Sequence, residues 1–183
     1  MKTLFLILTT YLLFTFSSDQ TTLSIKEGES VDGLVLEKNT VGNVTDKYGK
    51  EIKSNQGIID YENRAAVYIN RFYYSNNIVA VSLTDEGSEE SKTLTKSVIS
   101  EIGILYPTDA TTDKGVNLKS DNLEKIIKVY GQPEKQQTWK NNKDLHYYSQ
   151  GISFCCNNAD NHIEKIAIYK KGQHPDFYYW NTK

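Results

Sequence analysis

Apolar residues recur at helical spacing in two stretches of this chain, residues 39–50 and 121–133. The second stretch carries one apolar stripe, made of Leu123, Ile126, Ile127 and Tyr130. We expect Asp121 to cap the first turn of this helix, with Glu124 three residues on to complete a capping box. Gly131 can adopt the left-handed conformation that closes a helix, so the pattern predicts a short amphipathic helix that ends there.

Each predicted helix is followed by short runs rich in Tyr, Ile, Val and Phe. In the second half of the chain these runs are TWK, DLHYYS, GISFCCN and HIEKIAIYK. Turn-forming stretches such as NNKD, SQG and NNADN separate them. Short apolar runs joined by such turns are typical of an antiparallel meander.

The two halves of the chain show the same pattern. Gly33 aligns with Gly115, and the alignment continues without a gap to Gly49 on Gly131. Farther along, FYYSNNIVAV matches HYYSQGISFC, and VISEIGIL matches HIEKIAIY. Because helix and strands recur in the same order, we predict one structural unit that is present twice.

The fold class predicted from this repeat is α+β. Two helix-plus-antiparallel-meander repeats share one sheet, and both helices cover the same face of it. The predicted divisions are a signal peptide at 1–17, an N-terminal segment at 18–32, the first repeat at 33–106, and the second repeat with an aromatic C-terminal tail at 107–183.

The N-terminus has the layout of a secretory signal peptide. Lys2 supplies a positive charge, residues 3–16 form a mainly apolar run, and Ser17 and Ser18 end that run. A membrane-spanning helix needs ~20 apolar residues, and this run is shorter, so we expect no stable membrane span. We therefore expect cleavage after Ser17 and export to the periplasm or the medium.

The charge distribution argues against nucleic acid as a partner, and the cysteine content argues against a framework of disulfides. The 21 basic residues are scattered among 23 acidic ones, which leaves no concentrated basic face for nucleic acid. The cysteines are the adjacent pair Cys155 and Cys156, which point to opposite faces if they lie in a strand. We expect one to be a small core residue and the other a surface thiol, with a vicinal disulfide as the rarer alternative.

Strand alternation leaves one apolar face without a helix. In the first half, the side chains of Val79, Val81 and Leu83 point away from the predicted helix, and in the second half Tyr169 does the same. An uncovered apolar patch is a candidate contact site for a partner. The alternative is that the N-terminal segment or the aromatic tail HPDFYYW folds over this face and completes a second small core.

Motifs for catalysis or metal binding are missing from the sequence. His146, His162 and His174 stand in no HExxH-type arrangement, and there is no GxSxG sequence or phosphate-binding glycine loop. We therefore expect no metal and no cofactor. An alternative remains, in which His146, Tyr147 and Cys155 surround a pocket on adjoining strands, as in a small envelope enzyme or a protein that binds a small-molecule ligand.

The duplicated pattern resembles a set of bacterial envelope modules. The stretches that carry the resemblance are GVNL, DNLEKIIKVYGQP, LHYYSQGISF and HIEKIAIY. They are similar to the tandem repeats of β-lactamase-inhibitor-like proteins and to the outer-membrane assembly lipoproteins of the SmpA/OmlA type. This resemblance implies a non-catalytic protein that grips another protein, but it transfers no contact residue, and the lipid-attachment cysteine of the lipoproteins is missing here.

These observations predict an exported, non-catalytic protein-binding module, such as an inhibitor or an immunity-type protein. Its predicted partner is another protein, and its predicted contact residues are Val79, Val81, Leu83 and Tyr169. The small envelope enzyme or ligand-binding protein described above is the alternative function.

Overall fold

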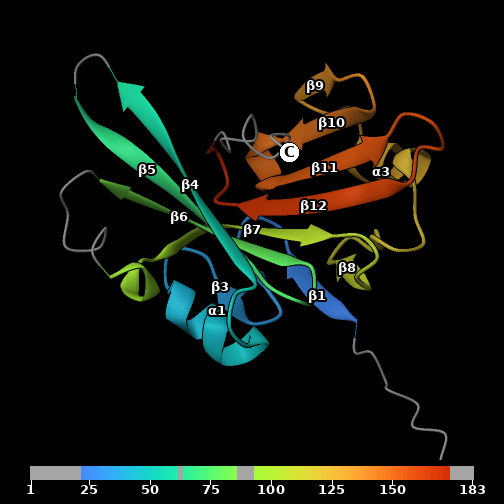
Figure 1. Ribbon diagram of the computed structural model, residues 1–183. Helices are drawn as coiled ribbons and strands as arrows, with labels where there is room; N and C mark the ends of the chain where they lie inside the picture. The colour runs from blue at the N-terminus through green and yellow to red at the C-terminus, as the bar shows by residue number, and fades with distance from the viewer. Residues whose placement is uncertain (1–21, 62–63, 86–92, 174–183) are drawn as a thin grey trace, which may run out of the picture.

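The computed structural model describes residues 22–61, 64–85 and 93–173 of the chain (Figure 1). The predicted signal peptide at 1–17 and the aromatic tail from residue 174 onward lie outside the described residues. Among the helices that are described, none is long and apolar enough to cross a membrane.

An eight-stranded antiparallel sheet is the largest element of the structure (Figure 1). The strand order is β4-β5-β6-β7-β12-β11-β10-β9. The first half supplies β4 (Lys53–Tyr61), β5 (Arg64–Tyr73), β6 (Ile78–Asp85) and β7 (Ile99–Leu105). The second half supplies β9 (Lys135–Thr138), β10 (Asn142–Tyr147), β11 (Ile152–Asn157) and β12 (Ile163–Tyr169).

A second, smaller sheet packs on the first together with the helices. Its strands, in spatial order, are β3 (Leu34–Val35), β2 (Ser30–Val31), β1 (Leu23–Lys26) and β8 (Ala110–Thr112). The pairing of β1 with β8 is parallel, which makes this sheet mixed. The helical segments are α1 (Val41–Tyr48), η1 (Leu94–Lys96), α3 (Leu123–Tyr130) and η2 (Tyr148–Gln150).

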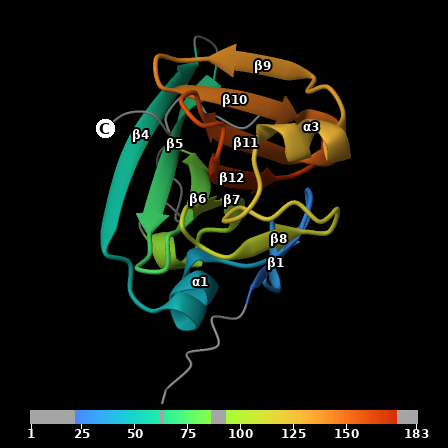
Figure 2. The same cartoon turned by 90° about the vertical axis from the view of Figure 1, so that its right-hand side faces the viewer.

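The predicted α+β class, with helices alone covering one face, is wrong. The structure is mostly β, because α1 and α3 have only eight residues each and twelve described segments are strands. A helix of that length is ~12 Å long and cannot cover eight strands. The small sheet lies between the two helices on that face (Figure 2), and its residues Ile25 and Val31 pack in the core with those of the helices.

The two halves of the large sheet meet where β7 pairs with β12. Gly103 lies opposite Ala167, which is its equivalent in the sequence alignment of the halves. The flanking pairs are Ile102 with Ile168 and Ile104 with Ile166. This register relates the strands next to the junction by an approximate two-fold axis. A common origin of the two halves stays a prediction.

One hydrophobic core fills the space between the large sheet and the layer of helices and small sheet. It includes Ile25 and Val31 from the small sheet, Val44 from α1, Ile126 from α3 and Phe154 from β11, all fully buried. Tyr130 of α3 packs against the rings of Tyr147 and Phe154 at centroid distances of 5.3 and 5.1 Å. Leu123, Ile126 and Tyr130 of the predicted stripe therefore anchor α3 to the sheet, whereas the core takes Val129 in place of the predicted Ile127.

The start of α3 differs from the prediction. The residue that caps the helix is Asn122, whose side chain accepts a hydrogen bond from the backbone N–H of Lys125 at 3.2 Å. The carboxylate of Asp121 instead accepts from the backbone N–H of Asn117 at 2.8 Å and so closes the preceding turn. The helix ends before Gly131, whose φ of +79° is a conformation that favours glycine.

Candidate functional site

The predicted contact residues lie on the face of the large sheet that points away from the helices, which we call the second face. Three of them are buried, since Val79 is 1% exposed, Val81 3% and Tyr169 1%. Leu83, near the end of β6, is 43% exposed. The structure therefore does not present these four residues as one exposed apolar patch, and only Leu83 is accessible to a partner.

The second face is polar over its second half. Across β10, β11 and β12, the register places His146 opposite Ser153 and Ser153 opposite Ala167. The imidazole Nδ1 of His146 lies 3.0 Å from the hydroxyl of Ser153, and that hydroxyl lies 2.7 Å from the phenol of Tyr169. The phenol of Tyr169 donates to the backbone carbonyl of Ile152 at 2.8 Å.

The direction of each hydrogen bond in the series from His146 to Ile152 follows from the last acceptor, the backbone carbonyl of Ile152. A carbonyl oxygen can only accept, so the single hydrogen of Tyr169 goes to Ile152. The hydroxyl of Ser153 must then donate to Tyr169, and it accepts from the Nδ1–H of His146. Ser153 is thereby held as a donor to a phenol, which is the opposite of a serine nucleophile activated by a histidine base.

A group of charged and titratable side chains lies one row farther along the same face. Register places Asp144 opposite Cys155 and Cys155 opposite Lys165. All three are buried. Burial lowers the pKa of Lys165 and raises the pKa of the Cys155 thiol far above its ordinary value. The thiol is therefore kept protonated, whereas a nucleophilic cysteine needs a lowered pKa.

The structure separates the residues of the predicted Tyr147, His146 and Cys155 pocket. His146 and Cys155 share the second face, on neighbouring strands. Tyr147 points into the core on the opposite face, where its phenol donates to the backbone carbonyl of Gly131 at 2.9 Å. The aromatic ring beside His146 is instead that of Tyr148, which stacks on the imidazole at a centroid distance of 5.4 Å.

The adjacent cysteines are unbonded to each other and both are buried. Cys156 belongs to the hydrophobic core, whereas Cys155 lies on the second face, where its Sγ accepts a hydrogen bond from the amide of Asn142 at 3.4 Å. The expectation of opposite faces is confirmed. The expectation of one surface thiol is wrong, because Cys155 is only 2% exposed.

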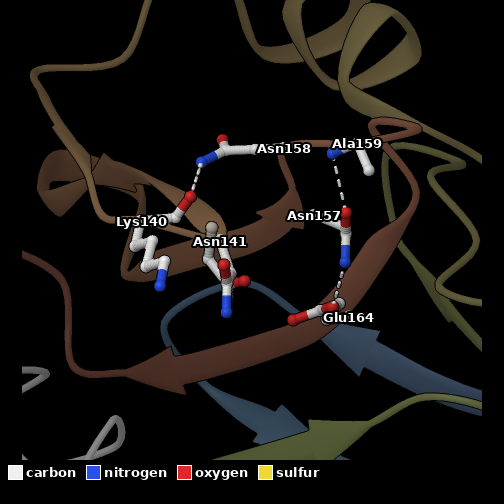
Figure 3. A pocket seen from close by; sticks show the side chains of 7 residues that line it. Lys140, Asn141, Asn157, Asn158, Ala159 and Glu164 are labelled. Atoms are coloured by element: carbon white, nitrogen blue, oxygen red, sulfur yellow. Dashed lines mark hydrogen bonds between the residues drawn. The ribbon is translucent and has the colours of Figure 1, made fainter.

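An open hollow lies at the outer end of the second face, where the β9–β10 and β11–β12 loops come together (Figure 3). We call it the asparagine hollow; its volume is about 490 Å³. Its lining residues are Lys140, Asn141, Asn142, Asn157, Asn158, Ala159 and Glu164. Small-molecule sites typically measure ~300–1,000 Å³, so the hollow has the size of a binding site.

Sheet pairing brings these two loops together. Asn142 at the start of β10 lies opposite Asn157 at the end of β11, so the loops beyond them are neighbours. The amide of Asn158 donates to the backbone carbonyl of Trp139 on the other loop at 2.8 Å. The amide of Asn157 donates to Glu164 at 2.8 Å (Figure 3). Hydrogen bonds across the gap therefore hold both loops in place.

A β-bulge places Glu164 in the hollow. Pairing between β11 and β12 passes from Cys155 opposite Lys165 to Cys156 opposite Ile163, which leaves Glu164 as the extra residue. A bulge of this kind re-aims one side chain, and bulges are frequent next to functional sites. The carboxylate of Glu164 consequently lines the hollow, whereas in a regular strand its side chain would point to the opposite face of the sheet.

Trp139 forms a wall next to the asparagine hollow. A smaller space of about 330 Å³ is lined by Trp139 together with Lys140, Asn141 and Asn142. It adjoins the hollow, because the last three residues line both. The indole is 42% exposed. Its Nε1–H donates to the buried carboxylate of Asp144 at 2.6 Å, which fixes the ring orientation. Trp139 is therefore an exposed aromatic surface that is held rigid.

Sequence reasoning missed this site. The stretch NNADN predicts a turn, and residues 158–160 form one. The stretch NNKD also predicts a turn, but only Asn141 lies outside strand β10, which begins at Asn142. Nothing along the chain shows that the two loops lie side by side. The signal that was available is Trp139, an aromatic residue next to an asparagine-rich turn. Within the ranges that the structure describes, no group of three His, Cys, Asp or Glu side chains could hold a metal ion.

Comparison with protein-family models, curated proteins and solved structures gives no match for this chain. The resemblance to β-lactamase-inhibitor-like and SmpA/OmlA-like modules therefore stays a prediction. The asparagine hollow with Trp139, and the buried polar chain on the second face, are the features that bear on function.

Proposed function

We propose that this chain is an exported, non-catalytic binding protein that recognises another protein through the asparagine hollow and Trp139. The observation that carries this proposal is the combination of a rigid, exposed indole with amide-rich loops. Tryptophan is a frequent anchor of protein interfaces, because it supplies a large contact area at little entropic cost. Asparagine side chains add adaptable hydrogen bonds around such an anchor.

The chemistry of the buried groups supports a non-catalytic function. Ser153 donates its hydrogen to Tyr169, and burial keeps Cys155 protonated, so neither side chain is prepared as a nucleophile. The alternative of a small enzyme that uses Tyr147 with His146 and Cys155 also requires a cluster that the sheet register separates.

The proposal is tested by comparing capture by three forms of the mature protein: wild type, Trp139→Ala and Leu83→Ala. Trp139 and Leu83 have almost equal exposure, 42% and 43%, but lie in different halves of the sheet, since Leu83 is on β6 and Trp139 follows the edge strand β9. Each form is immobilised and exposed to an extract of the cells that make it, and bound proteins are quantified by mass spectrometry. We expect Trp139→Ala to capture at least ten-fold less of a partner protein than wild type and Leu83→Ala capture.

Two outcomes would contradict the proposal. If Trp139→Ala captures the partner as well as wild type, the hollow is not the recognition site. If Leu83→Ala loses the partner instead, the contact lies at the exposed end of the second face. Circular dichroism spectra and melting temperatures of all three forms show whether either loss comes from unfolding.

A further inference from the structure

The hydrogen-bonding groups of the asparagine hollow indicate what class of ligand it takes. Several of them are already occupied within the protein: both polar atoms of Asn157 and the amide nitrogen of Asn158. Among the described residues, five groups of the lining keep no partner: the Lys140 ammonium, the Asn141 amide, the Asn142 and Asn158 side-chain oxygens, and the second carboxylate oxygen of Glu164. Donors and acceptors are therefore interleaved around one space.

We propose that the asparagine hollow binds a pyranose sugar unit, which stacks on Trp139 while its hydroxyls hydrogen-bond to these groups. This inference rests on the proposed function and names the chemical group that the site recognises on its partner. A sugar hydroxyl donates one hydrogen bond and accepts others, so it matches a mixed set of amide, carboxylate and ammonium groups. The apolar C–H face of a pyranose suits the electron-rich face of an indole.

The charges of the lining favour a neutral ligand. Lys140 and Glu164 line the same hollow with opposite charges. An anion such as phosphate would be drawn to Lys140 but repelled by Glu164, and a cation would meet the reverse. Neither charge opposes a hydroxyl-rich neutral molecule, because hydroxyls can accept from the ammonium and donate to the carboxylate. Figure 3 shows the side chains of Lys140, Asn141 and Glu164 extending toward the space between the loops.

The site is arranged before any ligand arrives. Asp144 is 3% exposed and holds the indole of Trp139 by its Nε1–H, which leaves the ring face unobstructed by that bond. The amide of Asn158 ties its own loop to the backbone of Trp139. Little side-chain freedom is then lost on binding, and this lowers the entropic cost of capturing a small ligand. Asp144 is a positioning residue in this arrangement.

The test is a titration of the mature protein with a panel of methyl glycosides, N-acetylhexosamines and short oligosaccharides, followed by NMR of the indole N–H signals. The Trp139 signal is assigned from its disappearance in Trp139→Phe. We expect at least one saccharide to shift the Trp139 signal in a saturable manner. Because the Trp139 variants lack this signal, the Kd of each form is measured by isothermal titration calorimetry. We expect the Kd to rise at least ten-fold in Trp139→Ala, to rise less in Trp139→Phe, and to stay unchanged in Leu83→Ala. Inorganic phosphate, used as the anionic control, should leave the signal unmoved.

The same experiment distinguishes the sources of the sugar. If the saccharide displaces the captured protein partner, and deglycosylation of that partner abolishes capture, the sugar is carried on the partner. If a soluble polysaccharide binds and a deglycosylated partner is still captured, the sugar belongs to a polysaccharide. Either result supports the inference.

Failure of the inference is separable from failure of the proposed function. If no saccharide moves the Trp139 signal while Trp139→Ala still loses its protein partner, the hollow recognises protein alone and the sugar inference is wrong. If saccharides do not bind and Trp139→Ala captures the partner normally, both proposals are wrong. A response to phosphate equal to that of the saccharides would also overturn the inference, because it would indicate an anion site.

Discussion

At the scale of single residues, Tyr169 shows how a position that pattern analysis assigns to a partner can be a structural one. Its phenol donates to the carbonyl of Ile152 and accepts from Ser153 in a buried chain. Tyr169→Phe would remove the phenol that donates to the Ile152 carbonyl and that accepts the hydroxyl hydrogen of Ser153. We expect the free energy of unfolding, measured by urea denaturation, to fall by about 1–3 kcal/mol. An unchanged free energy would show that solvent reaches Ser153 and Ile152.

A matched pair of substitutions tests the burial of the second face. Val79→Asp places a carboxylate at a position that is 1% exposed, between Tyr73 and Gly103 on the neighbouring strands. An uncompensated buried charge is very costly, so we expect unfolding or a loss of more than about 3 kcal/mol. Leu83→Asp, at 43% exposure on the same strand, should change stability by less than about 0.5 kcal/mol. Similar urea midpoints for the two variants would show that the face is open.

The two cysteines should be unreactive in the folded protein. Burial raises the pKa of Cys156 to about 12 and raises that of Cys155 further, so the nucleophilic thiolate is scarce at neutral pH. We expect iodoacetamide to label both residues at least 100-fold more slowly in buffer than in concentrated urea, as followed by mass spectrometry. Rapid labelling of Cys155 in buffer would mean that the second face opens readily.

The residues of the site could be predicted from the sequence only in part. Strand alternation correctly separates Cys155 from Cys156 and places Val79, Val81 and Tyr169 on one face. Alternation states which side chains share a face, but it does not state whether that face is accessible. It also fails at Glu164, because a bulge shifts the period by one residue there and no local pattern announces the shift.

At the scale of elements, the turn between η2 and β11 is a point of close packing that only glycine permits. Gly151 has φ and ψ of 71° and 36°, in the left-handed region. A Cβ at this position would collide with the carbonyl oxygen of Tyr169 and with the Cα of Gly28, which belongs to the turn between β1 and β2. The large sheet and the small sheet therefore touch through two glycines.

Gly151→Ala should destabilise the protein by about 2–4 kcal/mol, from the left-handed conformation and the collision together. Gly131→Ala serves as the control, because its φ is also positive but nothing lies within 4 Å of the added Cβ. We expect the control to lose about 1–3 kcal/mol in urea denaturation, because its φ of 79° and ψ of −161° also strain a residue other than glycine. Equal losses in the two variants would show that the contact with Gly28 has no energetic weight.

Elements with a strong local signal were predictable, and those that depend on distant partners were not. The stripe of α3 spans two turns, and the strands of the large sheet have four to ten residues, so periodicity identifies them. The strands β2 and β3 have two residues each, which is too short for any period. The pairing of β1 with β8 joins residues 23–25 to 110–112, and no short window of sequence contains both.

At the scale of the whole molecule, burial raises the pKa of seven phenols and thiols among the described residues and lowers the pKa of one lysine, Lys165. Burial raises the pKa values of Tyr48, Tyr74, Tyr130, Tyr147, Tyr169, Cys155 and Cys156. The pKa of Tyr147, for example, is raised to about 12. These groups come from α1, α3, the large sheet and the turn after β5, so their titration reports on the whole core and not on one site.

Raised pKa values make the protein sensitive to alkali. Above the ordinary values of 9.0 for a thiol and 10.0 for a phenol, the unfolded chain loses protons that the folded chain retains. The unfolded state then binds fewer protons, so the free energy of unfolding falls as pH rises through this range. Lys165 acts in the opposite sense, because burial lowers its pKa. Its contribution to the free energy of unfolding becomes more favourable as pH rises toward 10.5. One lysine opposes seven acids, so the net change is a loss.

We therefore expect the urea midpoint, followed by circular dichroism, to be nearly constant from about pH 7 to pH 8.5 and to fall steadily from about pH 9 to pH 11. Tyr147→Phe removes one of the titrating phenols and its hydrogen bond to Gly131. This variant should be less stable at pH 7 but should lose stability less steeply above pH 10. A midpoint that stays level to pH 11 would mean that water reaches these side chains in the folded state, and that the two layers do not enclose a dry core.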